Sequence, residues 1–394
     1  MITLIELDNF KSLVDFKLPL TKFNCLVGMN GAGKSTVLQG IDFIAQLMEG
    51  RLDNWLKERS WEASDLNSKF SKKSNITFKV VLQDAQLGEI SWSGSLNRSS
   101  LKCTQEIVEH NGVNILKLED GHYSLHLKKG SQLKEPKESF SVMFDYQGSI
   151  LSQLKDSLIS DTLALLKSRI LAIRSLDLLS PEQLRSRARA SDGKLGLGGQ
   201  KLSAYLHEQG VAGQQRLKEV LSEMYPKLDR VDVKSLISGW KDIEITEDFA
   251  GHKLRSKARH INDGLLRLMA ILSQLQSSND FLLFDEIENG INPEIIAFLV
   301  KTLVETEHQV LVTTHSPLIL NYLDDEVAKT GLVMLYKNSV GHSKAVRLFD
   351  LPAIAEKLTV MGPGEVFADT DLILLAKEAD LIHSKLTLKA MLEQ

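Results

Sequence analysis

The chain has 394 residues, of which 43% are hydrophobic, 25% charged and 6% aromatic, a composition that excludes a disordered or fibrous protein. Its formal net charge of −4 offers no overall attraction to nucleic acid or anionic lipid, so either would have to bind through a local patch. Two cysteines, Cys25 and Cys103, are too few for a disulfide framework or a four-cysteine zinc site and fit a reducing compartment.

The beginning of the sequence and its apolar runs argue against export and membrane insertion. Acidic Glu6 and Asp8 stand where a signal peptide would need a basic and then an apolar stretch. No run of about 18 apolar residues occurs, which is the length that a membrane-spanning helix needs. We therefore expect a cytoplasmic protein without a membrane anchor of its own.

In chain order, the first predicted elements are strands at residues 2–7 and 22–27 and a helix at 35–49. Gly50 is suited to end this helix. One face of the helix carries an apolar stripe made of Val37, Ile41, Ile44, Ala45 and Met48. Residues 51–74 are polar and rich in lysine, and we interpret them as a surface connection.

Residues 75–146 change to alternating, β-branched runs, which predict an antiparallel β subdomain. Turn residues at 91–94, 111–112 and 120–121 indicate hairpins within it. Leucine seams in 151–225 then predict a short helical insertion.

The last third of the chain returns to strands, at 228–250, 281–284 and 310–314, with a helix that begins near 263. We expect one domain over 1–394 with an α/β fold and a mixed sheet. Its predicted parts are a first lobe at 1–50, the β subdomain at 75–146, the helical insertion at 151–225, a second lobe at 226–345 and a C-terminal tail at 346–394.

The segment from Gly28 to Ser35 has the pattern G-x-x-x-x-G-K-S between a predicted strand and a predicted helix. In this arrangement backbone N–H groups and a helix N-terminus converge on the β- and γ-phosphates of a nucleotide. Lys34 is expected against those oxygens and Ser35 on Mg²⁺, whereas Asn30 fits a γ-phosphate contact and a tight turn almost equally well. The predicted ATP-binding residues of this loop are Asn30, Gly31, Ala32, Gly33, Lys34, Ser35 and Thr36.

Polar side chains follow two buried strands. Asp285 and Glu286 come directly after 281–284, at the sheet edge where ligands bind in open α/β folds. Asp285 is expected to hold the Mg²⁺ shell and Glu286 to act as general base on the attacking water. His315 follows the next strand and is expected to sense the γ-phosphate. The alternative is that the two acids merely begin a turn.

With these three motifs in this order, the chain resembles ABC-class ATPases of the SMC, RecF-like and OLD-like branch, of the AAA_21 or AAA_15 type. The resemblance covers nearly the whole chain and implies an ABC-type P-loop fold with ATP and Mg²⁺ as cofactors. Residues 7–13 are similar to the opening motif of the branch, which implies that Lys11 approaches the phosphates. Gln147 matches a glutamine that touches Mg²⁺ and the hydrolytic water, which implies a catalytic and metal-binding role.

Two further segments resemble parts of this branch that act between subunits. Residues 261–272 are similar to the signature, whose helix N-terminus caps the γ-phosphate on a second subunit; the matching residues are Asn262, Asp263, Gly264 and Arg267. The branch usually has serine in place of Asn262, although an amide can still donate, and an Asp-Gly hairpin is the alternative. Residues 287–293 resemble the loop that communicates across the dimer, with Asn289 and Asn292 in it and Ile287 in place of proline.

Two stripes of basic residues alternate with other residues, namely Lys253, Arg255, Lys257 and Arg259, and Arg185, Arg187 and Arg189. They could meet nucleic acid, an acidic partner or the nucleotide of a second subunit. Solvated faces explain them equally well, and no interleaved aromatic residues support base stacking.

The residues after His315 are too few for the nuclease domain that OLD-like proteins carry. Residues 361–366 are similar to the tail of free-standing ATPases encoded beside a separate effector in prokaryotic anti-phage systems. The resemblance therefore implies an ATP-dependent homodimer or higher oligomer that regulates a TOPRIM-like nuclease, an HNH nuclease or another toxin.

Other functions stay open. One is a nucleotide-gated scaffold or sensor with little turnover, and another is a DNA repair or recombination ATPase, which would need a long coiled coil or DNA-binding arm. A transporter subunit is disfavoured because the sequence lacks L-S-G-G-Q.

Overall fold

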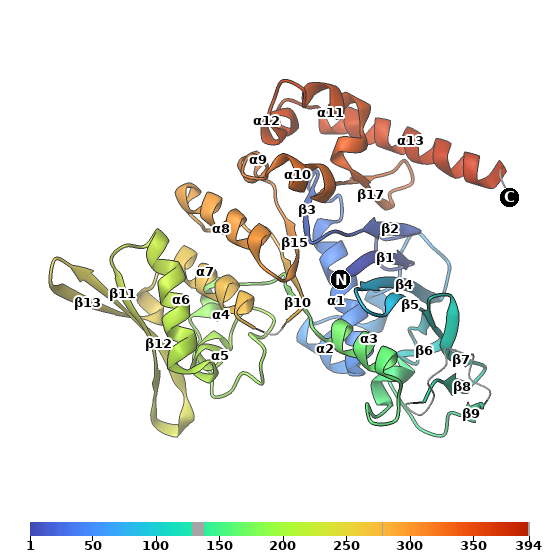
Figure 1. Cartoon of the computed structure of the whole chain (residues 1–394), viewed down its shortest axis with the longest axis horizontal. Helices are drawn as coiled ribbons and strands as arrows, with labels where there is room; N and C mark the ends of the chain where they lie inside the picture. Colours follow the sequence, from blue (N-terminus) through green and yellow to red (C-terminus); the bar gives the residue numbers. More distant parts are fainter. Residues whose placement is uncertain (128–137, 278, 393–394) are drawn as a thin grey trace. The chain divides into compact units, whose positions relative to one another are not determined.

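The computed structural model describes residues 1–127, 138–277 and 279–392. The chain divides into two compact units, which are described separately: unit 1 comprises Met1–Ile173 and Asp324–Gln394, and unit 2 comprises Arg174–Leu323 (Figure 1). These boundaries fall inside the predicted helical insertion and the predicted second lobe, so the compact units do not follow those predicted limits.

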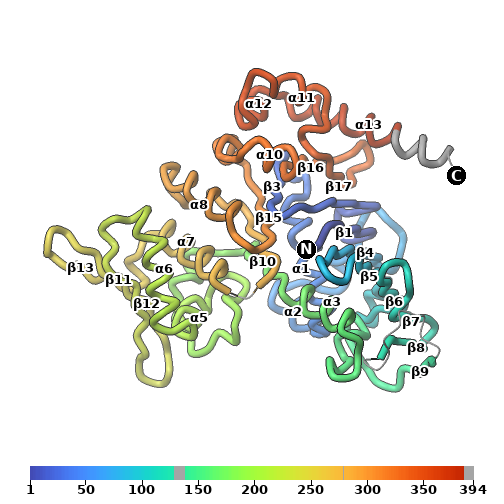
Figure 2. Tube along the Cα trace, in the orientation of Figure 1, coloured from blue at the N-terminus to red at the C-terminus, as the bar shows by residue number. Residues whose placement is uncertain are grey.

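Unit 1 contains an antiparallel sheet that includes the predicted β subdomain and two N-terminal strands, in the order β2-β1-β4-β5-β6-β7-β8-β9 (Figure 2). Asn111–Gly112 and Asp120–Gly121 form two of its turns, all four residues having positive φ, as the sequence predicts. The strands are β1 (Ile2–Asp8), β2 (Phe16–Pro19), β4 (Asn75–Asp84), β5 (Gly88–Asn97), β6 (Lys102–His110), β7 (Val113–Glu119), β8 (His122–Leu125) and β9 (Phe140–Ser141).

The hairpin predicted at 91–94 is wrong, because these residues lie in the middle of β5. Gly94 pairs with Phe78 on β4, and a Cβ on Gly94 would lie 2.8 Å from the Phe78 ring. The glycine thus makes room for a cross-strand aromatic side chain and does not mark a turn. The real turn precedes Gly88, where Asp84 Oδ1 accepts hydrogen bonds from the N–H groups of Gln86 and Leu87.

A parallel strand pair in unit 1 leads into the phosphate loop. β3 (Phe23–Val27) is buried at every position and pairs in parallel with β16 (Leu332–Lys337), which pairs antiparallel with β17 (Ser343–Arg347). Helix α1 (Lys34–Glu49) follows the loop and ends at Gly50, whose φ is 69°. The strand, loop and helix therefore lie in the order that the sequence predicts.

The interpretation of 51–74 as a surface connection is wrong in part. It contains helix α2 (Leu52–Glu58), whose Leu52, Trp55 and Leu56 are buried. These apolar residues recur at helical spacing and form an inward face. The surrounding charged residues hide this pattern from composition alone.

Unit 1 also contains helices beside α1 and α2. Helix α3 (Asp161–Leu171) packs on α1 and begins at Ser160, whose hydroxyl accepts a hydrogen bond from the Leu163 N–H. The other helices are α10 (Asp325–Gly331), α11 (Pro352–Lys357), α12 (Pro363–Ala368) and α13 (Leu372–Leu392). Among the described residues, no helix is both long and apolar enough to cross a membrane.

Unit 2 combines helices with a small antiparallel sheet, β11-β12-β13, against which α5 and α6 pack (Figure 2). Its elements up to this sheet are β10 (Ile173–Leu176), which begins at the last residue of unit 1, α4 (Pro181–Leu184), α5 (Leu202–Glu208), α6 (Gly210–Met224), β11 (Leu228–Ser235), β12 (Lys241–Phe249) and β13 (His252–Lys257).

The second half of unit 2 carries the remaining motifs. Strand β14 (Phe281–Phe284) has the predicted limits, and β15 (Gln309–Thr313) lies one residue earlier than predicted. The two strands are parallel, with Phe284 opposite Val312, so the residues that follow them emerge at the same edge. The helices are α7 (Asp263–Leu275), α8 (Pro293–Glu305) and α9 (Pro317–Leu320).

Candidate functional site

The phosphate loop has the local structure of an anion-binding helix N-terminus. Gly33 is the N-cap of the 16-residue helix α1, has φ 110° and provides no side-chain cap. The first-turn N–H groups of α1 are therefore left to an external acceptor. Asn30, Gly31 and Ser35 are exposed, so the tip of the loop is accessible to a ligand.

Two glycines of the loop are required by packing within unit 1. A Cβ on Gly28 would lie 2.2 Å from the Leu335 carbonyl oxygen of β16. A Cβ on Gly33 would lie 2.3 Å from the Ser343 hydroxyl of β17. The loop consequently lies directly on these two strands, which fix its shape.

Lys34 points back into the loop. The residue is buried, and its Nζ donates hydrogen bonds to the carbonyl oxygens of Gly28 at 2.8 Å and Met29 at 3.3 Å. A cation inside the loop, an uncapped helix N-terminus and the exposed Ser35 hydroxyl are the donor set that a triphosphate with Mg²⁺ requires. The loop thus fits the predicted ligand; Ala32 is buried and Thr36 is partly exposed on the first turn of α1.

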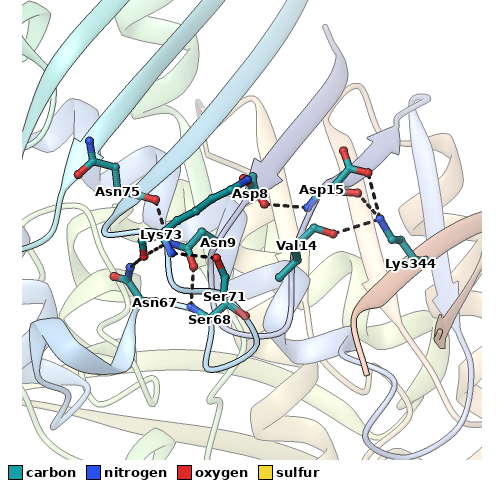
Figure 3. A network of polar contacts seen from close by, with 10 residues as sticks. All are labelled: Asp8, Asn9, Val14, Asp15, Asn67, Ser68, Ser71, Lys73, Asn75 and Lys344. Carbon is teal, nitrogen blue, oxygen red and sulfur yellow. Dashed lines mark hydrogen bonds and ion pairs between the residues drawn. The ribbon is translucent and has the colours of Figure 1, made fainter. Parts of the chain in front are cut away.

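The turn that carries Lys11 is held by a polar network (Figure 3). Asn9 Nδ2 donates to the carbonyl oxygens of Lys73 and Asn75, both at 2.8 Å. Asp8 accepts from the Asp15 N–H at 3.0 Å and from Lys73 Nζ at 2.5 Å. Burial raises the pKa of Asp8, but the hydrogen bonds from Lys73 and from the Asp15 and Asn9 backbones, with the charge of Lys73, together hold the pKa below its ordinary value.

Lys344 closes the other end of this turn (Figure 3). It is buried, and its Nζ donates to the carbonyl oxygens of Val14 at 3.1 Å and Asp15 at 2.6 Å. Asn9, Lys11 and Asp15 all have positive φ, a conformation that Asn and Asp tolerate but that is uncommon for lysine. The network therefore gives Lys11 a fixed backbone position.

Ser343, which belongs to no sequence motif, braces the phosphate loop. Its buried Oγ lies 2.7 Å from the Ala32 carbonyl, 2.8 Å from Ser12 Oγ and 2.9 Å from Lys337 Nζ. One hydroxyl can donate to Ala32 and accept from the other two groups, so all its hydrogen-bonding capacity is used. This residue connects the loop, the Lys11 turn and the β16–β17 hairpin.

We predict that Ser343→Ala weakens ATP binding about tenfold and lowers the free energy of unfolding by about 1–3 kcal/mol, because buried partners lose their acceptor or donor. ATP titration and chemical unfolding measure the two effects. Ser339→Ala, at an exposed position of the same hairpin, is the control. Equal affinity and stability in both variants would contradict a bracing role.

Gln147 is anchored in unit 1 by α2. Its amide oxygen accepts from the Asp53 N–H at 3.1 Å, and its amide nitrogen donates to Asp53 Oδ2 at 2.6 Å. The next residue, Gly148, has φ 67°, and a Cβ there would lie 2.2 Å from the Leu47 carbonyl oxygen of α1. The loop that carries Gln147 is therefore pressed against the helix that follows the phosphate loop.

A buried carboxylate supports the same loop from the sheet. Glu106 on β6 accepts hydrogen bonds from Trp92 Nε1 at 2.8 Å, the Ile150 N–H at 2.9 Å and the Ser149 hydroxyl. Complete burial raises the pKa of Glu106, and these three donors oppose the shift. No sequence motif identifies Glu106.

In unit 2, the predicted acids form a tight turn after β14. The Thr313 hydroxyl, at the end of β15, donates to Asp285 and accepts from the Glu286 N–H at 2.9 Å. Glu286 has φ 46°, an uncommon conformation for glutamate. Thr313 thus holds the Asp285 carboxylate and the Glu286 backbone, and no sequence motif identifies it.

Polar groups of unit 2 surround the Glu286 carboxylate. His315 Nε2 lies 3.7 Å from Glu286 Oε1, and Asn289 Nδ2 lies 3.5 Å from Glu286 Oε2. Glu288, which was not predicted, accepts from the His315 N–H at 2.8 Å and the Thr314 hydroxyl at 3.0 Å. The structure therefore gathers the predicted base, the predicted sensor and Asn289.

The signature forms a helix N-terminus, which excludes the hairpin alternative. Asn262 is the N-cap of α7, and its Oδ1 accepts from the Leu265 N–H at 2.8 Å. Asn262 and Asp263 are exposed, whereas Gly264 is buried. A Cβ on Gly264 would lie 2.6 Å from the Gly290 carbonyl oxygen, so this glycine is explained by packing inside the chain.

Arg267 does not face outward, which corrects its assignment to the surface offered to a second subunit. It is buried, and its Nη2 donates to the carbonyl oxygens of Asp285 at 2.7 Å and Glu286 at 2.8 Å. Burial lowers its pKa, and the charges of Glu286, Glu288 and Asp285 oppose the shift. Arg267 does not reach the surface because the second and third turns of α7 are buried on all sides. Its hydrogen bonds instead support the acidic turn of its own chain.

Asn292 lies outside the Glu286 cluster as it stands. It is the exposed N-cap of α8, and its carbonyl accepts from the Ile295 N–H at 2.9 Å. Ile287, in place of the usual proline, is fully buried, and its N–H donates to the Thr313 carbonyl at 3.3 Å. An N–H is needed at this position, which proline could not provide.

The basic stripes are partly neutralised within unit 2. Lys253, Arg255 and Lys257 alternate along β13, as predicted, but Lys253 pairs with Asp229 at 2.8 Å. Arg259 lies beyond the strand, in a 3₁₀ turn. The second stripe is not a strand: Arg185 donates to Asp263, Arg187 pairs with Asp242, and Arg189 lies 4.9 Å from the Trp240 ring. We therefore do not assign nucleic-acid binding to these residues.

The loop between β3 and α1, together with acids that follow a second buried strand, defines a P-loop ATPase with a mixed α/β fold. The chain belongs to the AAA_23 family of AAA domains, whose model matches residues 4–224, more than half of its length. A second model, AAA_21, matches residues 132–321, and its description names an AAA domain, the AbiEii toxin and a type IV TA system. The family supports an ATP-binding ATPase and implies nucleotide binding, usually with Mg²⁺.

Solved SMC heads share the fold. The SMC head bound to the C-winged helix domain of ScpA is 16% identical with a TM-score of 0.54, over 88% of this chain and 96% of that one. The head with an extended coiled coil from Pyrococcus furiosus, bound to the C-terminal domain of ScpA, is 15% identical with a TM-score of 0.52, over 91% and 99%. No curated protein in the comparison matches the chain.

Proposed function

We propose that this chain binds Mg-ATP and hydrolyses it as a dimer, in which the phosphate loop of one copy and the N-terminus of α7 in another hold the same triphosphate. The observation that carries the proposal is the pair of accessible helix N-termini. Helix α1 has no side-chain cap, and α7 presents exposed Asn262 and Asp263. Each is suited to an anion because the helix dipole favours negative charge at a helix N-terminus, and in α1 no side chain occupies the first-turn N–H groups.

The proposed roles follow from the groups that each unit assembles. Lys34, Ser35 and the first turn of α1 would bind the phosphates, with Lys11 beside them. Bound Mg²⁺ would neutralise phosphate charge, with Ser35, Asp285 and Gln147 as its proposed neighbours. Glu286 would accept the proton of the attacking water, and His315 would donate to the γ-phosphate.

Asn262 has one donor group, its amide nitrogen, with which to contact the triphosphate bound by another copy. Its Oδ1 accepts from the Leu265 N–H, so its amide nitrogen is the group that can face outward. A γ-phosphate oxygen needs such a donor, and Asn supplies it in place of a serine hydroxyl. This arrangement supports ATP capture by a second copy.

We also propose that the dimer controls a separate effector protein, a nuclease or toxin, in defence against phage. The similarity of residues 361–366 to the tail of free-standing ATPases supports this role. The description of the AAA_21 model, with its toxin and type IV TA system, agrees with it. The effector is proposed as a second protein, such as a TOPRIM-like or HNH nuclease.

Mixing two inactive variants tests the shared site. Lys34→Met removes the loop cation, and Asn262→Asp keeps the helix cap but sets a negative charge against the γ-phosphate. Each variant alone should be inactive, whereas a mixed dimer contains one site with both an intact loop and an intact signature. In a 1:1 mixture that assembles at random, half of the dimers are mixed and each has one intact site of two, so we expect about a quarter of the wild-type ATPase rate. Mixtures that stay inactive, although two differently tagged variants co-purify as mixed dimers, would exclude a shared site.

A nucleotide-gated scaffold with little turnover is the second candidate. The use of Asn262 Oδ1 as a helix cap favours it, because an amide locked in this way adapts less than a hydroxyl as charge builds up on the phosphate. Single-turnover hydrolysis separates the two candidates. A dimer that forms on ATP and retains it unhydrolysed for hours identifies the scaffold.

A further inference from the structure

Residues of α1 and of the segment that follows it contact Lys11 from two sides within unit 1. The Lys11 Nζ lies 3.2 Å from the centroid of the Trp61 ring and donates to Gln39 Oε1 at 3.0 Å. The Lys11 backbone N–H donates to the Leu66 carbonyl at 2.8 Å. Both the ammonium and the main chain of Lys11 are thus held by residues outside its own turn.

Trp61 is itself fixed to α1 through neighbouring side chains. Its ring packs edge to face on Trp55, with centroids 5.4 Å apart and planes at 87°. The Arg59 guanidinium lies 5.1 Å from the Trp61 ring, and its side chain is only 1% exposed. Asp42 on α1 accepts from Trp55 Nε1 and Arg59 Nη2, both at 2.7 Å. The indole therefore has a defined position relative to the helix that starts at the phosphate loop.

An aromatic face holds an ammonium group without neutralising it. The attraction comes from the ring quadrupole, which carries no net charge, and the same holds for the amide oxygen of Gln39. A lysine side chain otherwise loses rotamer entropy when it is fixed on a phosphate. Holding Lys11 in advance avoids part of this loss and keeps its charge available to an anion.

We propose that Trp61 is a positioning residue of the nucleotide site, which holds the Lys11 ammonium in the place where it meets the phosphates of ATP. The inference rests on the proposed function, because it assigns Trp61 a role through Lys11. The proposed role also explains why α2 has a buried face: this face contains Trp55, on which the Trp61 ring packs.

A double-mutant cycle on ATP affinity tests the proposal. Trp61→Leu should raise the Kd for ATP about tenfold, equivalent to about 1.4 kcal/mol. Lys11→Met should weaken binding at least as much, and the double variant should be no worse than Lys11→Met alone, since Trp61 acts only through Lys11. Trp61→Phe keeps an aromatic face and should recover most of the affinity.

Trp240→Leu is the matched control, because this tryptophan also carries a cation but lies in unit 2. It should leave the Kd for ATP unchanged. Wild-type affinity in Trp61→Leu, additive effects of the Trp61 and Lys11 substitutions, or no recovery in Trp61→Phe would each overturn the inference. If Trp61→Leu does not fold, the same cycle is run with Trp61→Phe, whose smaller effect must likewise vanish in the Lys11→Met background. Wild-type protein that binds no ATP would instead overturn the proposed function.

Discussion

Lys34→Met is expected to weaken ATP binding about a hundredfold or more, because a charge-assisted contact to phosphate is worth roughly 1.5–3 kcal/mol and Lys34 can make more than one. The substitution keeps the length and apolar stem of the side chain, which is buried in the loop. Isothermal titration with ATP measures the loss of affinity. Thermal unfolding of the same samples checks that the fold persists.

Lys22→Met is the control for this experiment. Lys22 is exposed just before β3, at the opposite end of the strand that leads into the loop. This variant should bind ATP as the wild type does. Equal affinity of the Lys34 and Lys22 variants would rule out the loop as the phosphate site.

Glu286→Gln is expected to reduce ATP hydrolysis by roughly 100- to 10,000-fold while ATP binding persists, since an amide cannot accept the proton of the attacking water. Glutamine has almost the same shape, and its single side-chain oxygen can keep one of the two contacts of Glu286, with Asn289 or with His315. The variant should therefore accumulate as an ATP-bound dimer. Phosphate release and sizing chromatography with ATP measure the two effects.

Glu294→Gln is the matched change at an exposed position in the first turn of α8. It should leave both turnover and oligomeric state unchanged. A Glu286→Gln variant that hydrolyses ATP at the wild-type rate would refute the role of Glu286 as base. If Glu286→Gln loses turnover but forms no dimer with ATP, Glu286 remains the proposed base and the proposed ATP-dependent dimer is rejected.

The sequence predicts best those parts of the fold whose pattern is local. Strand β14 is a continuous apolar run, and helix α7 starts at a capping residue followed by an apolar stripe, so both begin where predicted. The phosphate loop is equally local, because strand, glycines and helix follow one another. The acids and the histidine of unit 2 could also be predicted to lie together, because the parallel strands β14 and β15 end at a common edge.

What the sequence does not reveal are contacts between distant segments. Ser343 and Ala32 are 311 positions apart, and a single serine near a strand start has no distinguishing pattern. Thr313 has the same character, since only the structure sets its hydroxyl between Asp285 and the Glu286 N–H. Arg267 shows the opposite problem: it matches a motif, but the motif does not say which way the side chain points.

The brace on the phosphate loop has a consequence for synthesis of the protein. The loop lies on Leu335 and Ser343, and Ser343 follows Ala32 of the loop by 311 positions in the chain. Chains grow from the N-terminus at about 5–20 residues per second, so the loop leaves the ribosome well before its supports do. A nascent chain consequently has its nucleotide motif before the strands that shape it, and we expect ATP binding only after β16 and β17 have been made.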